Sequence, residues 1–135
     1  MPGLSNLNDK EFIRAFQVTD AVIQNNHPVF MFTWIGSIFS LLSTILISFV
    51  SFAFNETWLV VLLCVFYLFG VHGTTIAIHI PLNNHIQQVV IEELNDEVIA
   101  HERIKFEKKW NYFNNIRTCI SILVSLLLLI QLSLH

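Results

Sequence analysis

Charged residues are absent from three long stretches of this chain. No Asp, Glu, Lys or Arg lies between Asp20 and Glu56, between Glu56 and Glu92, or after Arg117, whereas 54% of the residues are hydrophobic. A charge at the centre of a bilayer is costly, and only helices or closed barrels satisfy the backbone in hydrocarbon. The sequence therefore predicts an integral membrane protein whose helices cross the bilayer in these stretches.

Cysteine and basic residues are also scarce, which excludes further classes of protein. The two cysteines, Cys64 and Cys119, lie in charge-free stretches without metal-ligand spacing. We expect both to be small buried residues and not part of a disulfide framework. With a net charge of −3 and no basic stripe, the chain is not expected to bind nucleic acid. No cleaved secretory signal is evident, because the first apolar run is too long.

Three segments are apolar enough to span a membrane, which takes about 20 helical residues. They are residues 28–54, 58–80 and 118–135. Pro81 is expected to end or kink the second span. The third is short, but the helix-forming sequence before it can extend it. We therefore predict an all-α membrane protein, with residues 1–135 forming a single membrane domain of three transmembrane helices.

The Lys and Arg residues predict the orientation of the chain. All seven lie in residues 1–27 and 81–117, and the link between the first two spans has none. Lys and Arg near the ends of spans resist translocation. Both polar segments are therefore expected to face the cytoplasm.

The N-terminal polar segment is expected to form a helix. Asn8 followed by Glu11 fits a capping box, and Phe12, Phe16 and Ile23 then recur at helical spacing. This pattern predicts an amphipathic helix that lies on the membrane surface. We expect it to anchor the chain in the interface; the alternative is a lid over a pocket that opens at that face.

The second polar segment is also expected to be helical. After Pro81 a helix should resume and run through Ile86 to Ile91. It should break near Asn95-Asp96-Glu97, which resembles an N-cap followed by acids in the first turn. A last helix should then run from about Asp96 into the third span. One of its faces combines aromatic bulk, an amide and a cation. The members of this face are Ile99, Phe106, Trp110, Phe113, Asn114 and Arg117.

Polar side chains gather where the second span ends and the last one begins, so we expect any chemistry there. The candidates are His72, His79, Asn83, Trp110, Asn114 and Arg117. His72 and His79 share a helix face but lie about 10.5 Å apart along the axis, too far to bind one metal ion. No other metal-type ligand set is present, so we expect no metal or haem.

These residues also have structural interpretations. Each histidine is either a hydrogen-bonded packing residue or a proton-transfer group. Arg117 at the end of a span often reaches lipid phosphate, and Trp110 near it often belongs to the aromatic belt.

Two motifs resemble the anthrone oxygenase-like family of small helical membrane proteins, often described only as a domain of unknown function. Residues 79–84 read HIPLNN and residues 110–118 read WNYFNNIRT, similar to the family patterns Asn-x-Pro-Leu-Asn and Trp-x-x-x-Asn-x-x-Arg-Thr. His79 stands where the family usually has Asn. The family usually has another apolar helix before the stretch that matches residues 1–4. The resemblance therefore implies a four-helix bundle lacking its first helix, with oligomerisation or an upstream segment covering the open flank.

The resemblance implies oxidation of an anthrone to an anthraquinone without a recognised cofactor. Such chemistry requires a base, for which His79 or His72 is suited, and a group that stabilises an enolate or peroxide, for which Arg117 is suited. Trp110 would form a flat wall of the site, and Asn83 and Asn114 would orient oxygens. The expected partners are the lipid bilayer and a small hydrophobic aromatic ligand of the anthrone or quinol type.

The alternative is a non-enzymatic structural or accessory subunit whose polar cluster serves helix packing. Interhelical polar bonds in membranes are worth about 0.6–2 kcal/mol, enough to set helix register. If Asn83, Asn114 and Arg117 saturate one another, the accessory role is favoured; an apolar cavity that ends at them favours a ligand. A transporter is less favoured, because the spans contain no Asp, Glu or Lys and the chain shows no internal repeat.

Overall fold

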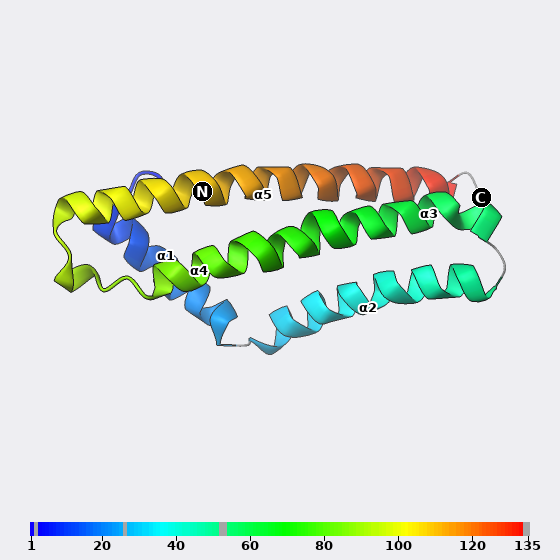
Figure 1. The fold of residues 1–135 in the computed structure, drawn as a ribbon, viewed down its shortest axis with the longest axis horizontal. Coiled ribbons are helices and arrows are strands. Elements are labelled where there is room, and N and C mark those ends of the chain that lie inside the picture. Colours follow the sequence, from blue (N-terminus) through cyan, green and yellow to red (C-terminus); the bar gives the residue numbers. More distant parts are fainter. Residues whose placement is uncertain (2, 26, 52–53, 134–135) are drawn as a thin grey trace.

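Helices make up all the regular structure in the part of the chain that the computed structural model describes, which is residues 1, 3–25, 27–51 and 54–133. They form an elongated bundle in which α5 runs beside a long second helix, α2 lies against one part of that helix, and α1 crosses the other end (Figure 1). The α-helices are α1 (Asp9–Gln24), α2 (Pro28–Val50), α3 (Phe54–Tyr67), α4 (Ile80–Gln87) and α5 (Asp96–Ser133). The π-helices η1 (Leu68–Gly73) and η2 (Thr75–His79) join α3 to α4, and the 3₁₀ helix η3 (Ile91–Glu93) precedes α5.

Three helices are long and apolar enough to cross a membrane, as the charge-free stretches predict. They are α2, the continuous run Thr57–Gln87, which we call the second helix, and α5. This finding confirms the all-α class and the number of spans. The end of the first span was placed too far along the chain, because α2 ends at Val50 and Phe54 already begins α3. Residues 52–53 and 134–135 of the predicted spans lie outside the described residues.

The second helix continues past Pro81, so of the two outcomes predicted for this proline, an end or a kink, the end is wrong. A proline lacks an N–H and crowds the preceding turn, so it usually breaks an α-helix. Here it follows the wider π-helical turns of η2, in which the Ile80 amide donates to the Thr75 carbonyl five residues earlier. Pro81 then occupies the first turn of α4, where its missing N–H costs least. The helix predicted after Pro81 is confirmed through Ile86, but it ends at Gln87 and does not reach Ile91.

The helix α1 begins at the predicted capping box but does not use its apolar face as predicted. Asn8 caps the helix, and the Glu11 side chain returns a bond to the Asn8 backbone. Phe12 and Phe16 are buried in a core with Phe106 of α5. The face that we expected to enter the membrane surface is therefore part of the protein core, and α1 packs on α4 and α5.

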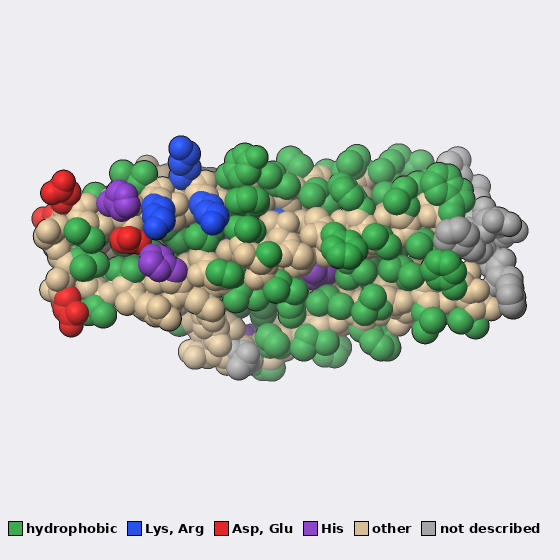
Figure 2. All heavy atoms as spheres, viewed as in Figure 1, with side chains coloured by type: hydrophobic (Ala, Val, Ile, Leu, Met, Phe, Trp, Pro, Cys, Tyr) green, Lys and Arg blue, Asp and Glu red, His purple; other side chains and the backbone are tan. Residues whose placement is uncertain are grey.

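Charged residues fix α1 to the start of α5. Arg103 donates to the Leu7 carbonyl (2.7 Å) and the Asp9 carboxylate (2.9 Å), and its guanidinium lies 4.6 Å from the centre of the Phe12 ring. On the face shown in Figure 2, charged side chains gather at this end and hydrophobic ones cover the other helices. The Asn95 side chain caps α5 by accepting from the Val98 amide, as the sequence predicts. We call this end of the molecule, which consists of α1 and the start of α5, the polar end. It is folded and lies next to the apolar helices.

The helix α2 leaves most of its apolar side chains exposed. It packs on α3 and η1, and its most apolar window contains no buried residue in the described part of the chain. Phe32 and Phe39 are 82% and 72% exposed. Lipid or another chain must cover these side chains, and the oligomer stays a prediction. Cys64 is buried as expected; Cys119 is exposed on the outer face of α5, so its predicted burial is wrong.

Gly70 allows the second helix to approach α5 closely, and this contact is testable. A Cβ at residue 70 would lie 2.8 Å from Cδ1 and 3.2 Å from Cγ2 of Ile120. Because a β-branched side chain is stiff, we expect Gly70→Ala to destabilise the protein by about 1–3 kcal/mol. Thermal unfolding in detergent measures this change as a lower Tm.

The double variant Gly70→Ala with Ile120→Val provides the control, because Ile120→Val removes the closest atom. The loss of Tm caused by Gly70→Ala should be smaller in the Ile120→Val background than in the wild type. Equal losses in the two backgrounds would show that the contact does not limit packing.

Candidate functional site

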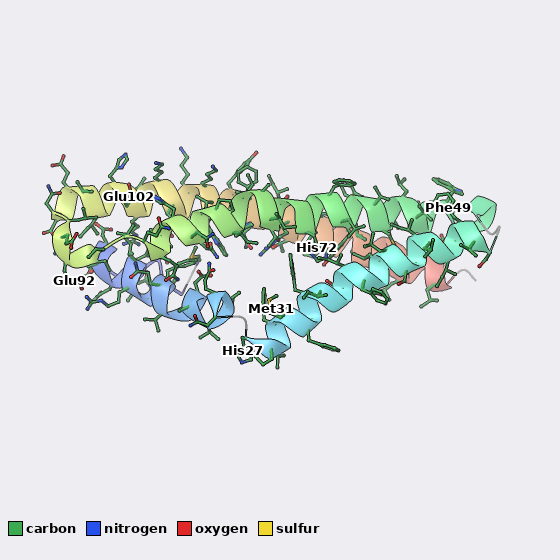
Figure 3. The ribbon with its side chains drawn as sticks, turned by 60° about the horizontal axis from the view of Figure 1, so that its bottom comes forward. His27, Met31, Phe49, His72, Glu92 and Glu102 are labelled. Atoms are coloured by element: carbon green, nitrogen blue, oxygen red, sulfur yellow. The ribbon has the colours of Figure 1, made fainter. Side chains whose placement is uncertain are left out.

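A cavity of about 430 Å³ lies where the polar end meets the apolar helices. Its volume falls within the usual range for small-molecule sites. The helix α2 diverges from the second helix toward its Pro28 end, where Met31 lies (Figure 3). The apolar lining consists of Phe16, Ile23, Phe30, Met31, Trp34, Ile80 and Trp110. The polar lining consists of Thr19, Asp20, Gln24, Thr75, His79, Asn83 and Arg117.

Four of the six predicted site residues line this cavity. They are His79 and Asn83 from the second helix and Trp110 and Arg117 from α5. These four side chains thus come together where the second helix packs on α5, and their roles stay a prediction. His72 and Asn114 are not among the lining residues.

Arg117 is held by hydrogen bonds to two helices. It donates to Thr75 Oγ1 on η2 and to Asn114 Oδ1 one turn earlier on α5, each at 2.9 Å. The side chain therefore bonds within the protein, and Asn114 fixes its direction without lining the cavity. Since a guanidinium carries five N–H groups, these two bonds leave donors for a ligand.

His79 and Trp110 bring unpartnered polar atoms to the cavity. His79 is 3% exposed, and its ring packs edge to face on Trp110 with the centroids 5.2 Å apart. Neither ring nitrogen of His79 has a hydrogen-bond partner among the described residues. The Trp110 Nε1 has none among them either. Buried polar groups are rarely left unsatisfied, because this costs about 1–3 kcal/mol each. Both residues are thus suited to bind a polar group of a ligand.

His72 lies in a different environment, between α2 and the second helix (Figure 3). Its ring packs on Trp34 and Tyr67, with centroid distances of 5.8 and 5.6 Å. His72 Nε2 lies 3.3 Å from Ser37 Oγ on α2. The interpretation of His72 as a hydrogen-bonded packing residue fits this position.

Asp20 is a lining residue that the sequence analysis missed. Its side chain is 4% exposed, and it accepts hydrogen bonds from Asn83 Nδ2 at 2.7 Å and from Gln24 and Gln87 at 3.1 Å each. None of the ion pairs in the described part of the chain includes Asp20. One signal could have revealed it: Asp20 follows Phe12 and Phe16 at steps of four, so it lies on their apolar face.

A row of polar side chains on the second helix connects the two ends of the cavity. Thr75, His79, Asn83 and Gln87 recur at every fourth position. Thr75 bonds Arg117, whereas Asn83 and Gln87 bond Asp20. His79 lies between them on the helix. Within the described residues, no group of three or more His, Cys, Asp or Glu side chains is placed to hold a metal ion.

Comparison with known families gives one result that bears on this site. A family model described as anthrone oxygenase matches residues 28–127. The match covers α2, the second helix and most of α5, with all six predicted site residues, but it does not include α1. No curated protein and no solved structure matches the chain.

An aromatic molecule that enters the cavity should quench two of the three tryptophans. Trp34 and Trp110 line the cavity, whereas Trp58 is 53% exposed near the start of α3. Titration of the protein in detergent with anthraquinone should therefore give a saturable decrease in tryptophan fluorescence. The amplitude should fall in Trp34→Phe and Trp110→Phe and persist in Trp58→Phe. A decrease that depends mainly on Trp58, or that never saturates, would contradict binding in the cavity.

Proposed function

The chain belongs to the anthrone oxygenase family, and on this premise we propose that it oxidises a small hydrophobic aromatic substrate of the anthrone or quinol type, without a recognised cofactor. The observation that carries the proposal is the apolar cavity in which His79, Trp110 and Arg117 meet. Apolar pockets with a few convergent polar groups are the usual form of small-molecule sites. An accessory subunit with a polar packing cluster would not need such a cavity.

The proposed reaction consumes one dioxygen per anthrone and releases one water. A base removes a proton from the CH₂ group opposite the anthrone carbonyl, and the resulting enolate passes one electron to dioxygen. The substrate radical and superoxide combine and take up a proton, which gives a hydroperoxide at the same carbon. Loss of the second C–H proton then breaks the O–O bond, forms the quinone carbonyl and releases water.

We assign the base to His79. Its ring lines the cavity, and no described residue occupies its nitrogens. A neutral imidazole has a nitrogen that can accept a proton from the substrate and return one later. His72 lies outside the lining, which favours His79 over His72 for this role.

We assign stabilisation of the anion to Arg117 and the flat wall of the site to Trp110. Arg117 is half-buried and directed by Thr75 and Asn114, so its charge is fixed before the substrate binds. Fixed donors in a water-poor site stabilise a developing oxyanion more than mobile ones do. The Trp110 indole offers a flat surface and an N–H donor, and Asn83 orients a substrate oxygen.

We also propose that the charged end of the molecule faces the cytoplasm, because all seven Lys and Arg residues belong to it. Single cysteines at Lys108 and at Ser51, introduced after replacing Cys64 and Cys119 by serine, should report opposite sides. A membrane-impermeant maleimide should label Ser51→Cys in intact cells and Lys108→Cys only after the membrane is opened. The reverse pattern would overturn this orientation.

The oxidation is tested by adding anthrone to the purified protein in detergent and following quinone absorbance. We expect His79→Ala to lower the rate by about 10²–10⁴-fold, the usual contribution of a general base. Arg117→Lys keeps the charge but loses the two directed bonds, and we expect a rate at least about tenfold lower.

His85→Ala is the matched control, since His85 lies on α4 but pairs with Glu102 outside the cavity lining. It should leave the rate unchanged. Wild-type turnover no faster than autoxidation, or equal losses in all three variants, would contradict the proposal.

A further inference from the structure

One end of the cavity contains a buried acceptor that has no hydrogen-bond donor among the described residues. Asp20 and Asn83, which we call the acceptor pair, both line the cavity and come from α1 and α4. Asn83 Nδ2 donates to Asp20 Oδ1 at 2.7 Å. This bond fixes the orientation of the Asn83 amide, because the flipped amide would point its oxygen at the carboxylate.

The fixed amide leaves Asn83 Oδ1 buried without a donor among the described residues. The neighbouring side-chain amides have no N–H to spare. Gln24 Nε2 donates to Asp20 and Asn84, and Gln87 Nε2 donates to Asp20 and the Gln17 carbonyl. Each NH₂ group has two hydrogens, so both amides are fully used. Neither of these amides can therefore supply the hydrogen bond that Asn83 Oδ1 lacks.

The other end of the cavity has the opposite character. Arg117 lies there and has N–H groups beyond its bonds to Thr75 and Asn114. A ligand that satisfies both ends presents an acceptor, such as a carbonyl, to Arg117 and a donor to the acceptor pair. The lining between the two ends is aromatic and aliphatic, which suits a flat hydrocarbon frame.

We infer that the acceptor pair is a specificity determinant that selects aromatic substrates carrying a hydroxyl group away from the reacting carbonyl. The hydroxyl donates to Asn83 Oδ1, and Asp20 holds the Asn83 amide in place and accepts a share of the same hydrogen. Asp20 lies on α1, before the family match begins at residue 28. The specificity of this chain thus depends on a helix outside the matched segment.

This inference rests on the proposed function for the position of the substrate, but its test needs no turnover. The unreactive probes are two pairs of anthraquinones: the 1-hydroxymethyl and 1-methyl derivatives, and the 2-hydroxymethyl and 2-methyl derivatives. The members of each pair differ by one hydroxyl. Their Kd values are measured by tryptophan quenching. We expect wild-type protein to bind at least one hydroxymethyl isomer about tenfold or more tightly than its methyl counterpart.

Asp20→Leu should reduce this preference to less than about threefold, because the Asn83 amide loses the acceptor that orients it. The ratio of the two Kd values within one variant cancels a general loss of folded protein, and Tm identifies such a loss separately. The matched control Glu93→Gln removes an exposed acid outside the cavity lining and should keep the full preference.

Equal binding of every pair by wild-type protein, absence of binding by all probes, or a full preference in Asp20→Leu would each overturn the inference. A clear preference in a protein that does not oxidise anthrone would uphold it and contradict only the proposed reaction. The two proposals can therefore fail separately.

Discussion

The packing of α1 on α5 is the contact on which the cavity depends. Phe16 meets Phe106 with the ring centroids 4.6 Å apart and Trp110 at 6.3 Å. Burying such side chains contributes about 1.5–3 kcal/mol each. Arg103 of α5 also fixes the start of α1 through its bonds to Leu7 and Asp9. This packing brings Asp20 to the second helix and closes one wall of the cavity. Without α1, the polar atoms of Asn83 would lie at an open surface.

The second helix distributes its polar side chains between the two ends of the cavity. Its π-helical turns let the chain pass Pro81 without a break, so that Thr75, His79 and Asn83 stay on one continuous element. Arg117 then bonds at one end of the row and Asp20 at the other. The Arg117 cation and the Asp20 carboxylate thus lie at different ends of one cavity, with His79 between them. Neither charge neutralises the other by direct contact. π-Helical turns often occur at functional sites.

Much of this arrangement could be predicted from the sequence, because hydrocarbon imposes a strong penalty on charge. The three spans, the capping box of Asn8 and the gathering of His79, Asn83, Trp110 and Arg117 follow from patterns within single helices. The errors concern contacts between helices. The burial of Asp20 depends on three amides from its own helix and from α4, and the path through Pro81 depends on the preceding π-helical turns. The separation of His72 from the cavity likewise depends on where α2 packs.

The central claim is that His79, Trp110 and Arg117 form one binding site for a flat aromatic ketone. An experimental structure of the protein with anthraquinone bound tests this claim most directly. We expect density for the ligand in the cavity, with one carbonyl directed at Arg117 and the ring system against Trp110. Ligand density elsewhere on the bundle, or a cavity filled by the protein's own side chains with the His79 nitrogens bonded to them, would contradict the account.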